Sequence, residues 1–148
     1  MTEINLTQQE ADALLTMLKV PEVGDPAPFP GPGQDLEIRL LSKDTRESFL
    51  LNLRRNRFEL GRATYQTRAR VVVVLARLDL HRAPHRNPDG IEVSGTHLHV
   101  YRHGFGDRWA LEIPNEAFPD PGDVWHSFHD FLKFCNITED LPINRGLF

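Results

Sequence analysis

Cysteine is almost absent from this chain of 148 residues, whose only thiol is that of Cys135. A single cysteine excludes an intramolecular disulfide. The chain does not need one, because a domain of this length buries about two thirds of the surface that its unfolded form exposes. Cys135 ends the apolar run 131–135, and we interpret it as a small buried side chain rather than as a nucleophile.

Long apolar runs are also missing. No stretch approaches the roughly 20 apolar residues that cross a bilayer, and residues 1–5 lack the basic start and apolar core of a signal peptide. We therefore expect a cytoplasmic protein. A phosphate-binding loop, a dinucleotide fingerprint, Gly-x-Ser-x-Gly and Cys-x-x-Cys are absent as well, which argues against the enzyme classes that these motifs identify.

A net positive charge is the third absence. The formal net charge is −4, which argues against a protein whose whole surface binds nucleic acid. Arginine is nevertheless unevenly distributed, since Arg54, Arg55, Arg57 and Arg62 lie close together. This distribution is compatible with a local basic patch.

Two helices are predicted, one near each end of the chain. Thr7 and Glu10 have the spacing of a capping box, and an apolar stripe follows at helical period, so we predict a helix over 7–19. A second helix is predicted over 120–135, where an Asp-Pro pair supplies a favourable start. Segment 21–33 holds five prolines and three glycines and is predicted to be an irregular connector.

Residues 35–113 are predicted to form strands. Apolar residues alternate over 36–40 and 49–53, as is typical of half-buried strands. A longer run covers 65–80, and its continuously apolar centre, 71–75, predicts a central strand covered on both faces. A hairpin is expected from two further strands, 96–102 and 109–113.

This order of elements predicts an α+β fold. We expect one domain, 1–148, with a mostly antiparallel sheet of about five strands and with the N-terminal and C-terminal helices packed on it.

Histidine is the most distinctive residue of the sequence. Five of the seven histidines lie between positions 81 and 103. Since alternate residues of a strand share a face, His97, His99, Tyr101 and His103 are predicted to point to the same side, opposite the apolar residues between them. Three imidazoles and a phenol in a row are unusual for a merely solvated face.

One interpretation of this face is catalytic. Two neighbouring histidines can act as base and acid near neutral pH, so His97 and His99 are the candidates for proton transfer, with His85 as an alternative. Tyr101 would orient a substrate, Arg68 and Arg70 would hold its phosphate, and His103 would be a further substrate-binding residue. These residue types suit a metal-independent endoribonuclease, which needs no cofactor.

Two other interpretations stay open. His97 and His99 could bind a metal together with His81, His85 or Asp89, although no glutamate follows as in cupin-like sites, and we assign no metal ligand. Alternatively the face packs beneath the connector 21–33 or against a partner chain. Asp79 and His81 share strand spacing, and a surface salt bridge is the simpler explanation for them.

Several runs of the sequence resemble an uncharacterised family of small bacterial and phage proteins. They lie at 64–68, 78–79, 84–90, 97–110 and 131–137, and include HRNPDG and HLHVYRHGFGDRWA. The family is one of unknown function, so the resemblance implies no catalytic residues. It implies a bacterial or prophage origin and a cytoplasmic setting. By analogy, small proteins of that kind are often toxins of toxin–antitoxin pairs, defence components or inhibitors of defence.

The first hypothesis is therefore a toxin-like endoribonuclease that acts on RNA. An antitoxin is a possible protein partner of such a toxin. The second hypothesis is a non-catalytic phage or defence-related binding protein that inhibits a host or defence component. The third is a metalloprotein with histidine ligands.

Overall fold

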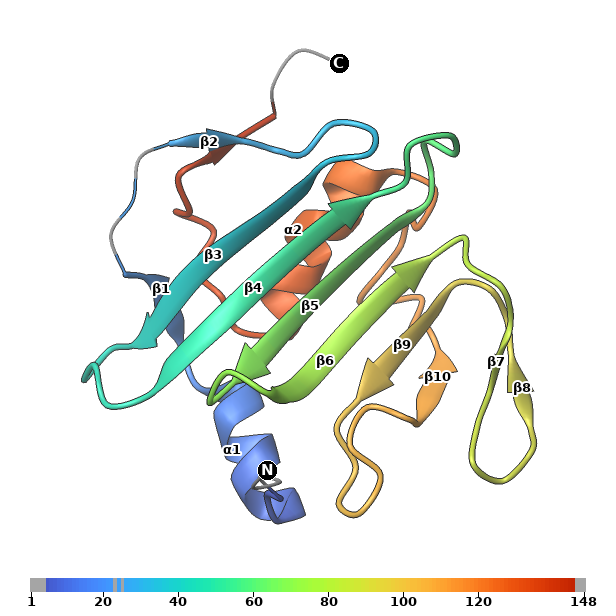
Figure 1. Cartoon of the computed structure of the whole chain (residues 1–148), viewed down its shortest axis with the longest axis horizontal. Coiled ribbons are helices and arrows are strands. Elements are labelled where there is room, and N and C mark those ends of the chain that lie inside the picture. Colours follow the sequence, from blue (N-terminus) through green and yellow to red (C-terminus); the bar gives the residue numbers. More distant parts are fainter. Residues whose placement is uncertain (1–4, 23, 25, 146–148) are drawn as a thin grey trace.

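The architecture is built on one antiparallel sheet, which Figure 1 shows face on. The structure is a computed structural model, and it describes residues 5–22, 24 and 26–145. Within these residues the sheet has seven strands in the order β1-β3-β4-β5-β6-β9-β10. They are β1 (Lys19–Pro21), β3 (Asp35–Ser42), β4 (Ser48–Arg55), β5 (Ala63–Ala69), β6 (Val73–Leu80), β9 (His97–Val100) and β10 (Ala110–Glu112).

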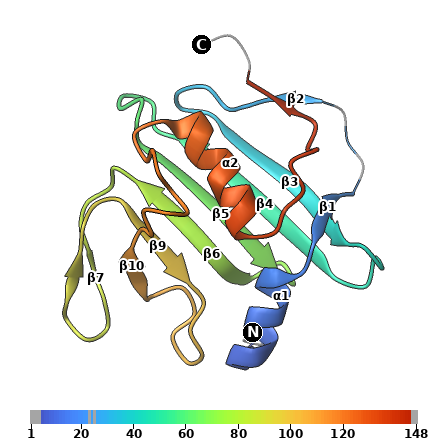
Figure 2. The same ribbon diagram turned by 180° about the vertical axis from the view of Figure 1, so that it is seen from behind.

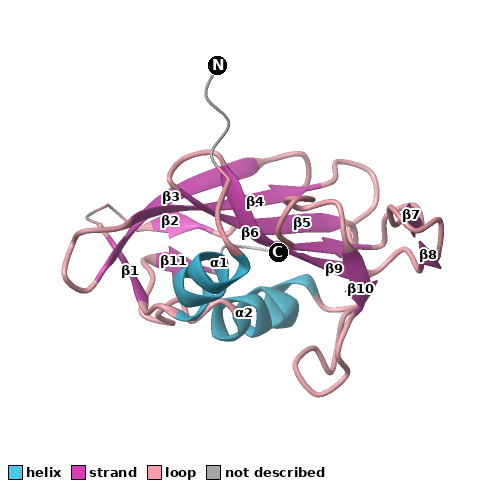
Figure 3. Cartoon of the chain, turned by 90° about the horizontal axis from the view of Figure 1, so that it is seen from below, coloured by secondary structure: helices cyan, strands magenta, loops and turns pink. Residues whose placement is uncertain are grey.

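Two helices, α1 (Gln8–Thr16) and α2 (Val124–Phe134), lie on one face of this sheet, as the views from behind and from below show (Figures 2 and 3). The α+β class is therefore confirmed, with seven strands in the main sheet rather than five. The face of the sheet that the helices leave uncovered is called the open face below. None of the helices in the described segments has the length and apolar character needed to cross a bilayer.

The first helix begins as predicted and ends early. Thr7 and Glu10 form the capping box, but the helix stops at Thr16 and the chain enters β1. The ammonium of Lys19 explains this end, because its Nζ donates to the carbonyl oxygens of Leu15 (2.8 Å), Met17 (2.9 Å) and Cys135 (2.7 Å). A cation is favourable at the carboxyl end of a helix, and here the one ammonium serves the carboxyl ends of both α1 and α2.

The connector contains more structure than predicted. Its strand β2 (Ala27–Pro28) pairs in parallel with β11 (Ile143–Asn144). Phe29 follows and is buried, with its ring centroid 5.3 Å from those of Trp125 and Phe128. The connector therefore packs against α2, at the other side of the molecule from β9 (Figure 2).

The prediction of one continuous strand over 65–80 is wrong. It is two strands, β5 and β6, joined by a turn in which Arg70 and Val71 have positive φ (50° and 68°). Val71 and Val72 are each 61% exposed, so the first two residues of the apolar segment 71–75 lie at the tip of a hairpin and the rest belong to β6. After the turn, Val73 and Leu75 are buried in the core, which accounts for the apolar character of this later part of the segment.

Strand alternation separates the core from the open face. Leu51, Tyr65, Leu78 and Leu98 are fully buried on the helix side. The second helix contributes Phe128, Phe131 and Leu132 to the same cluster, on the face that its spacing predicts. Its N-cap is Asp123 rather than Asp120.

A short hairpin lies beside the last strands and consists of β7 (His85–Arg86) and β8 (Glu92–Val93). The amide of Asn87, which follows β7, donates to the carbonyl of Ala110 and accepts from its N–H, both at 2.8 Å. This side chain thus pairs with the backbone of β10 as a neighbouring strand would.

Candidate functional site

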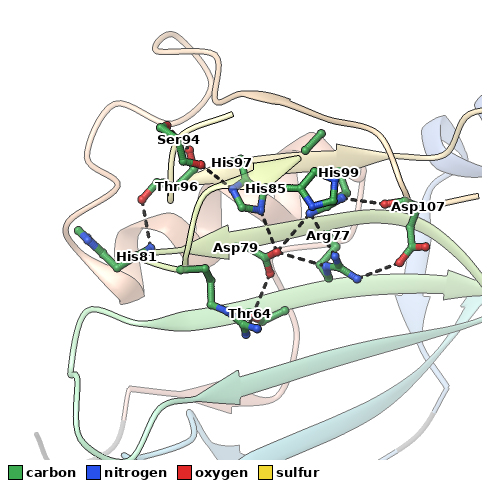
Figure 4. A network of polar contacts seen from close by, with 12 residues as sticks. Thr64, Arg77, Asp79, His81, His85, Ser94, Thr96, His97, His99 and Asp107 are labelled. Atoms are coloured by element: carbon green, nitrogen blue, oxygen red, sulfur yellow. Dashed lines mark hydrogen bonds and ion pairs between the residues drawn. The ribbon is translucent and has the colours of Figure 1, made fainter. Parts of the chain in front are cut away.

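Strand register brings two histidines opposite an arginine and an aspartate. β9 pairs with β6, which sets His99 across from Arg77 and His97 across from Asp79. Leu98 and Leu78 point into the core, so these four polar side chains project from the open face. Figure 4 shows them gathered around the carboxylate of Asp79.

His97 and Asp79 form a buried charged pair. Nδ1 of His97 lies 2.6 Å from the carbonyl oxygen of Ser94, and Nε2 lies 3.1 Å from Oδ2 of Asp79. Both partners can only accept, so the imidazole donates from both nitrogens. Burial by itself lowers the pKa of His97, but the hydrogen bonds to Asp79 and Ser94 outweigh it, and the pKa is raised.

His99 has a different role in the network. Its Nδ1 donates to the carbonyl of Asp107 (2.7 Å), and its Nε2 accepts from Nη2 of Arg77 (3.1 Å), because a guanidinium can only donate. The same guanidinium is 3.4 Å from Oδ2 of Asp79 and 2.8 Å from Oδ2 of Asp107. Arg77 therefore contacts His99 and the carboxylates of both Asp79 and Asp107.

The third histidine comes from the hairpin. His85 Nε2 donates to the carbonyl of Arg108 (2.7 Å), and its ring lies 4.6 Å from that of His99 and 5.6 Å from that of His97, between centroids. One ligand atom from each of the three rings lies within 4.8 Å of the others. His85, His97 and His99 are called the histidine cluster below.

Tyr101 and His103 do not join this cluster. The hydroxyl of Tyr101 donates to the carbonyl of Leu6 (2.7 Å) and accepts from its N–H (3.0 Å). His103 is exposed and its Nδ1 lies 3.0 Å from the same carbonyl. The prediction that Tyr101 and His103 share a face with His97 and His99 is thus wrong. The reason is that β9 ends at Val100, and the chain then turns toward the start of α1.

The two predicted phosphate-binding arginines also lie elsewhere. Arg68 is on the open face but donates to Glu37 and Asn52, each at 3.0 Å. Arg70 is in the β5–β6 turn and pairs with Glu47 at 3.1 Å. Both guanidinium groups are thus engaged with other side chains, and the arginine that bonds to the histidine cluster is Arg77.

Arg77 and Asp79 are the site residues that sequence reasoning missed. A strand of sixteen residues is far longer than the usual length of about six, and splitting it would have placed its second half beside β9. Asp79 was instead matched with His81, which is exposed and has positive φ (54°).

A groove of about 690 Å³ lies next to the cluster on the open face. Its lining includes Arg77, Asp79, Thr64 and Gln66. A second hollow of about 270 Å³ adjoins it and shares Arg54 and Arg82 with it, among other residues. We call this second hollow the arginine pocket, because it is lined by Arg54, Arg55, Arg57, Arg62 and Arg82.

The charge of the arginine pocket is unbalanced. Among the described residues that line it, Asp35 is the only carboxylate, and it lies 3.3 Å from Nε of Arg54. Arg55 is buried and donates to the carbonyls of Pro30 (3.0 Å) and Leu60 (3.1 Å), so it forms a wall of the pocket. Arg57 and Arg82 are exposed and could contact an anion directly.

The family model that matches this chain covers residues 6–137, and its description is a family of unknown function (DUF6978). The chain belongs to this family. The match includes α1, the sheet, the histidine cluster and α2, so the family resemblance extends over the site as well as the fold. No curated protein and no solved structure matches the chain significantly.

Proposed function

We propose that the protein binds single-stranded RNA, with phosphates in the arginine pocket and the nucleic acid continuing along the open-face groove. The observation that carries the proposal is the concentration of five arginines around one hollow in a chain of net charge −4. Guanidinium groups bind phosphate with two parallel hydrogen bonds, and such contacts provide most of the affinity for nucleic acid.

The residues around the pocket support this proposal. Phe58 is 86% exposed at the tip of the β4–β5 loop, and the guanidinium carbon of Arg57 is 5.8 Å from its ring centroid. Exposed aromatic rings beside cations are stacking platforms for unpaired bases. In the adjoining groove, Asn52, Thr64 and Gln66 offer donors and acceptors, which suit base edges and the 2′-hydroxyl.

The proposal is one of binding, since the histidines are poorly placed to reach a substrate. His97 and His99 are 2% and 1% exposed, whereas a general base must come within hydrogen-bonding distance of the proton that it removes. RNA cleavage by these residues, and a toxin-like or defence role in the cytoplasm, stay predictions. Incubation with labelled RNA tests cleavage in the same samples.

The arginine pocket predicts a salt-dependent affinity. In a double variant, Arg57→Ala with Arg82→Ala, binding to a fluorescent 12-nucleotide RNA should weaken about tenfold or more, and the salt slope should fall by about one for each phosphate that is no longer neutralised. Fluorescence anisotropy between about 50 and 200 mM salt measures both. DNA of the same sequence shows whether the 2′-hydroxyl matters.

The matched control is Arg46→Ala with Arg86→Ala. These side chains are also highly exposed (Arg46, 87%; Arg86, 70%) and do not line the pocket. They should leave the affinity nearly unchanged. The proposal is wrong if the wild-type chain does not bind RNA, or if both double variants weaken binding equally.

Phe58 gives a separate prediction. Phe58→Ala should weaken RNA binding about tenfold while leaving the salt slope unchanged, because a stacked base contributes roughly 1–3 kcal/mol without releasing ions. Ile91→Ala is the control, since Ile91 is 65% exposed on another loop. An equal loss with both substitutions, or a loss with neither, would contradict base stacking on Phe58.

A further inference from the structure

We propose that His85, His97 and His99, together with Asp79, form a binding site for one divalent transition-metal ion of the zinc type. The proposal goes beyond RNA binding and does not depend on it. Its starting point is the proximity of the three rings, whose ligand atoms lie within 4.8 Å of one another. The three rings are also oriented as metal ligands are.

Each ring is oriented through one nitrogen by a main-chain carbonyl. His97 and His99 donate from Nδ1 to Ser94 (2.6 Å) and Asp107 (2.7 Å), and His85 donates from Nε2 to Arg108 (2.7 Å). A carbonyl oxygen only accepts, so each of these nitrogens carries a hydrogen. The other nitrogen of each ring is then available as a ligand, and at His97 the metal would displace the proton that Nε2 donates to Asp79. Histidines that bind metals are held by such hydrogen bonds, which fix the tautomer and the ring orientation.

The spacing of the donor atoms fits a four-coordinate ion. Oδ2 of Asp79 lies 3.1 Å from Nε2 of His97 and 3.3 Å from Nε2 of His99. Two ligands of a tetrahedral zinc ion, each about 2.0–2.1 Å from the metal, are about 3.3 Å apart. The carboxylate of Asp79 therefore already lies at about the separation of two ligands from each of these histidine nitrogens. His85 would complete the set, since one of its ring nitrogens lies within 4.8 Å of a ligand atom of each of the other two histidines.

Arg77 occupies the metal-free network and competes with a cation. Its Nη2 donates to Nε2 of His99 at 3.1 Å. It also has a second partner, since its Nη1 is 2.8 Å from Oδ2 of Asp107, so the guanidinium can leave His99 and stay paired with Asp107. Imidazole ligands suit zinc, copper and nickel, whereas magnesium prefers oxygen ligands. We therefore expect binding of Zn²⁺ and none of Mg²⁺.

The test uses the whole chain after dialysis against a chelator. Zn²⁺ is titrated in competition with a chromophoric chelator, and the expected result is one ion per chain. Loss of an outer partner of a ligand already lowers metal affinity about 10–100-fold, so His85→Ala should lower it more than about 100-fold. His85 is half-buried on the hairpin, and circular dichroism checks that the variant is folded.

Two further variants separate a metal site from adventitious binding. His81→Ala removes a neighbouring exposed histidine and should leave the affinity for Zn²⁺ unchanged. Arg77→Met removes the competing cation and should raise this affinity, which a purely structural arginine would not do. The proposal is overturned if less than one Zn²⁺ binds, if His85→Ala binds like the wild type, or if His81→Ala loses as much affinity as His85→Ala.

Discussion

Asp79→Asn is expected to lower the free energy of unfolding by about 3 kcal/mol, the lower end of the loss found when one partner of a buried charged pair is removed. Asp79 is 6% exposed, and its two oxygens contact Thr64 (3.0 Å), His97 (3.1 Å) and Arg77 (3.4 Å). Asparagine keeps the size of the side chain but removes the charge. The cations of His97 and Arg77 then face each other without the anion between them.

The stability lost in Asp79→Asn should depend on pH, because the pKa values of Asp79 and His97 are both shifted in the folded protein. Burial by itself raises the pKa of Asp79, but its contacts with His97 and His99 and the charge of Arg77 hold the pKa far below the ordinary value of 3.8. This contribution to stability is present above about pH 4 and is lost as the pH falls. The pKa of His97 is raised above 6.5, so its contribution is present below that pH and is lost as the pH rises through the raised pKa.

The difference in stability between the wild type and Asp79→Asn should therefore be largest between about pH 4 and pH 6.5 and smaller on either side. Urea unfolding at a series of pH values, in buffer with a chelator, measures it. Asp140→Asn is the control, because Asp140 is exposed and should change stability by no more than about 0.5 kcal/mol. A loss below about 1 kcal/mol that is also independent of pH would contradict the charged pair.

Gly95→Ala is expected to be equally damaging, at about 3 kcal/mol, which is the upper end of the usual cost of overpacking. A Cβ atom at position 95 would overlap the carbonyl oxygen of Arg82. The two backbones are close because the N–H of Arg82 donates to the carbonyl of Gly95 at 2.7 Å. Backbone must move to relieve the overlap, and Ser94, whose carbonyl orients His97, is the adjacent residue.

The matched control for this substitution is Gly122→Ala. A Cβ atom there would lie 3.7 Å from Oδ1 of Asp120, which is an ordinary contact. Its stability should stay within about 0.5 kcal/mol of the wild type. Urea unfolding compares the two variants, and the histidine signals in NMR spectra report on the cluster. Equal stability of both variants would show that the chain accommodates a side chain at position 95 without strain.

Local signals in the sequence predicted much of the fold. The capping box of Thr7 and Glu10 depends on a spacing of three residues, and it starts α1. The apolar face of α2 follows from helical period in the same way. The error at 65–80 arose because hydrophobic pattern alone does not show a turn that has neither glycine nor proline. Arg70 and Val71 adopt positive φ there, which is uncommon for such residues.

The candidate site could be predicted only in part, because it depends on which strands pair. His97 and His99 share a face, as alternation within one strand requires. Arg77 and Asp79 reach them through the pairing of β6 with β9, which is a long-range choice that no local pattern records. His85 reaches them through a hairpin whose position is set by Asn87 and Arg108. Those contacts come from the tertiary structure.

The hydrogen bonds between the Asn87 side chain and Ala110 block the β10 edge of the sheet. A free edge strand is a template on which another chain can add a strand, and proteins avoid this by blocking the edge. At β10 the Asn87 amide already takes both hydrogen-bonding groups of Ala110, and at the opposite edge β1 has three residues and finishes in Pro21. Both margins are therefore poor templates for strand addition, which protects a broad, partly uncovered sheet against aggregation.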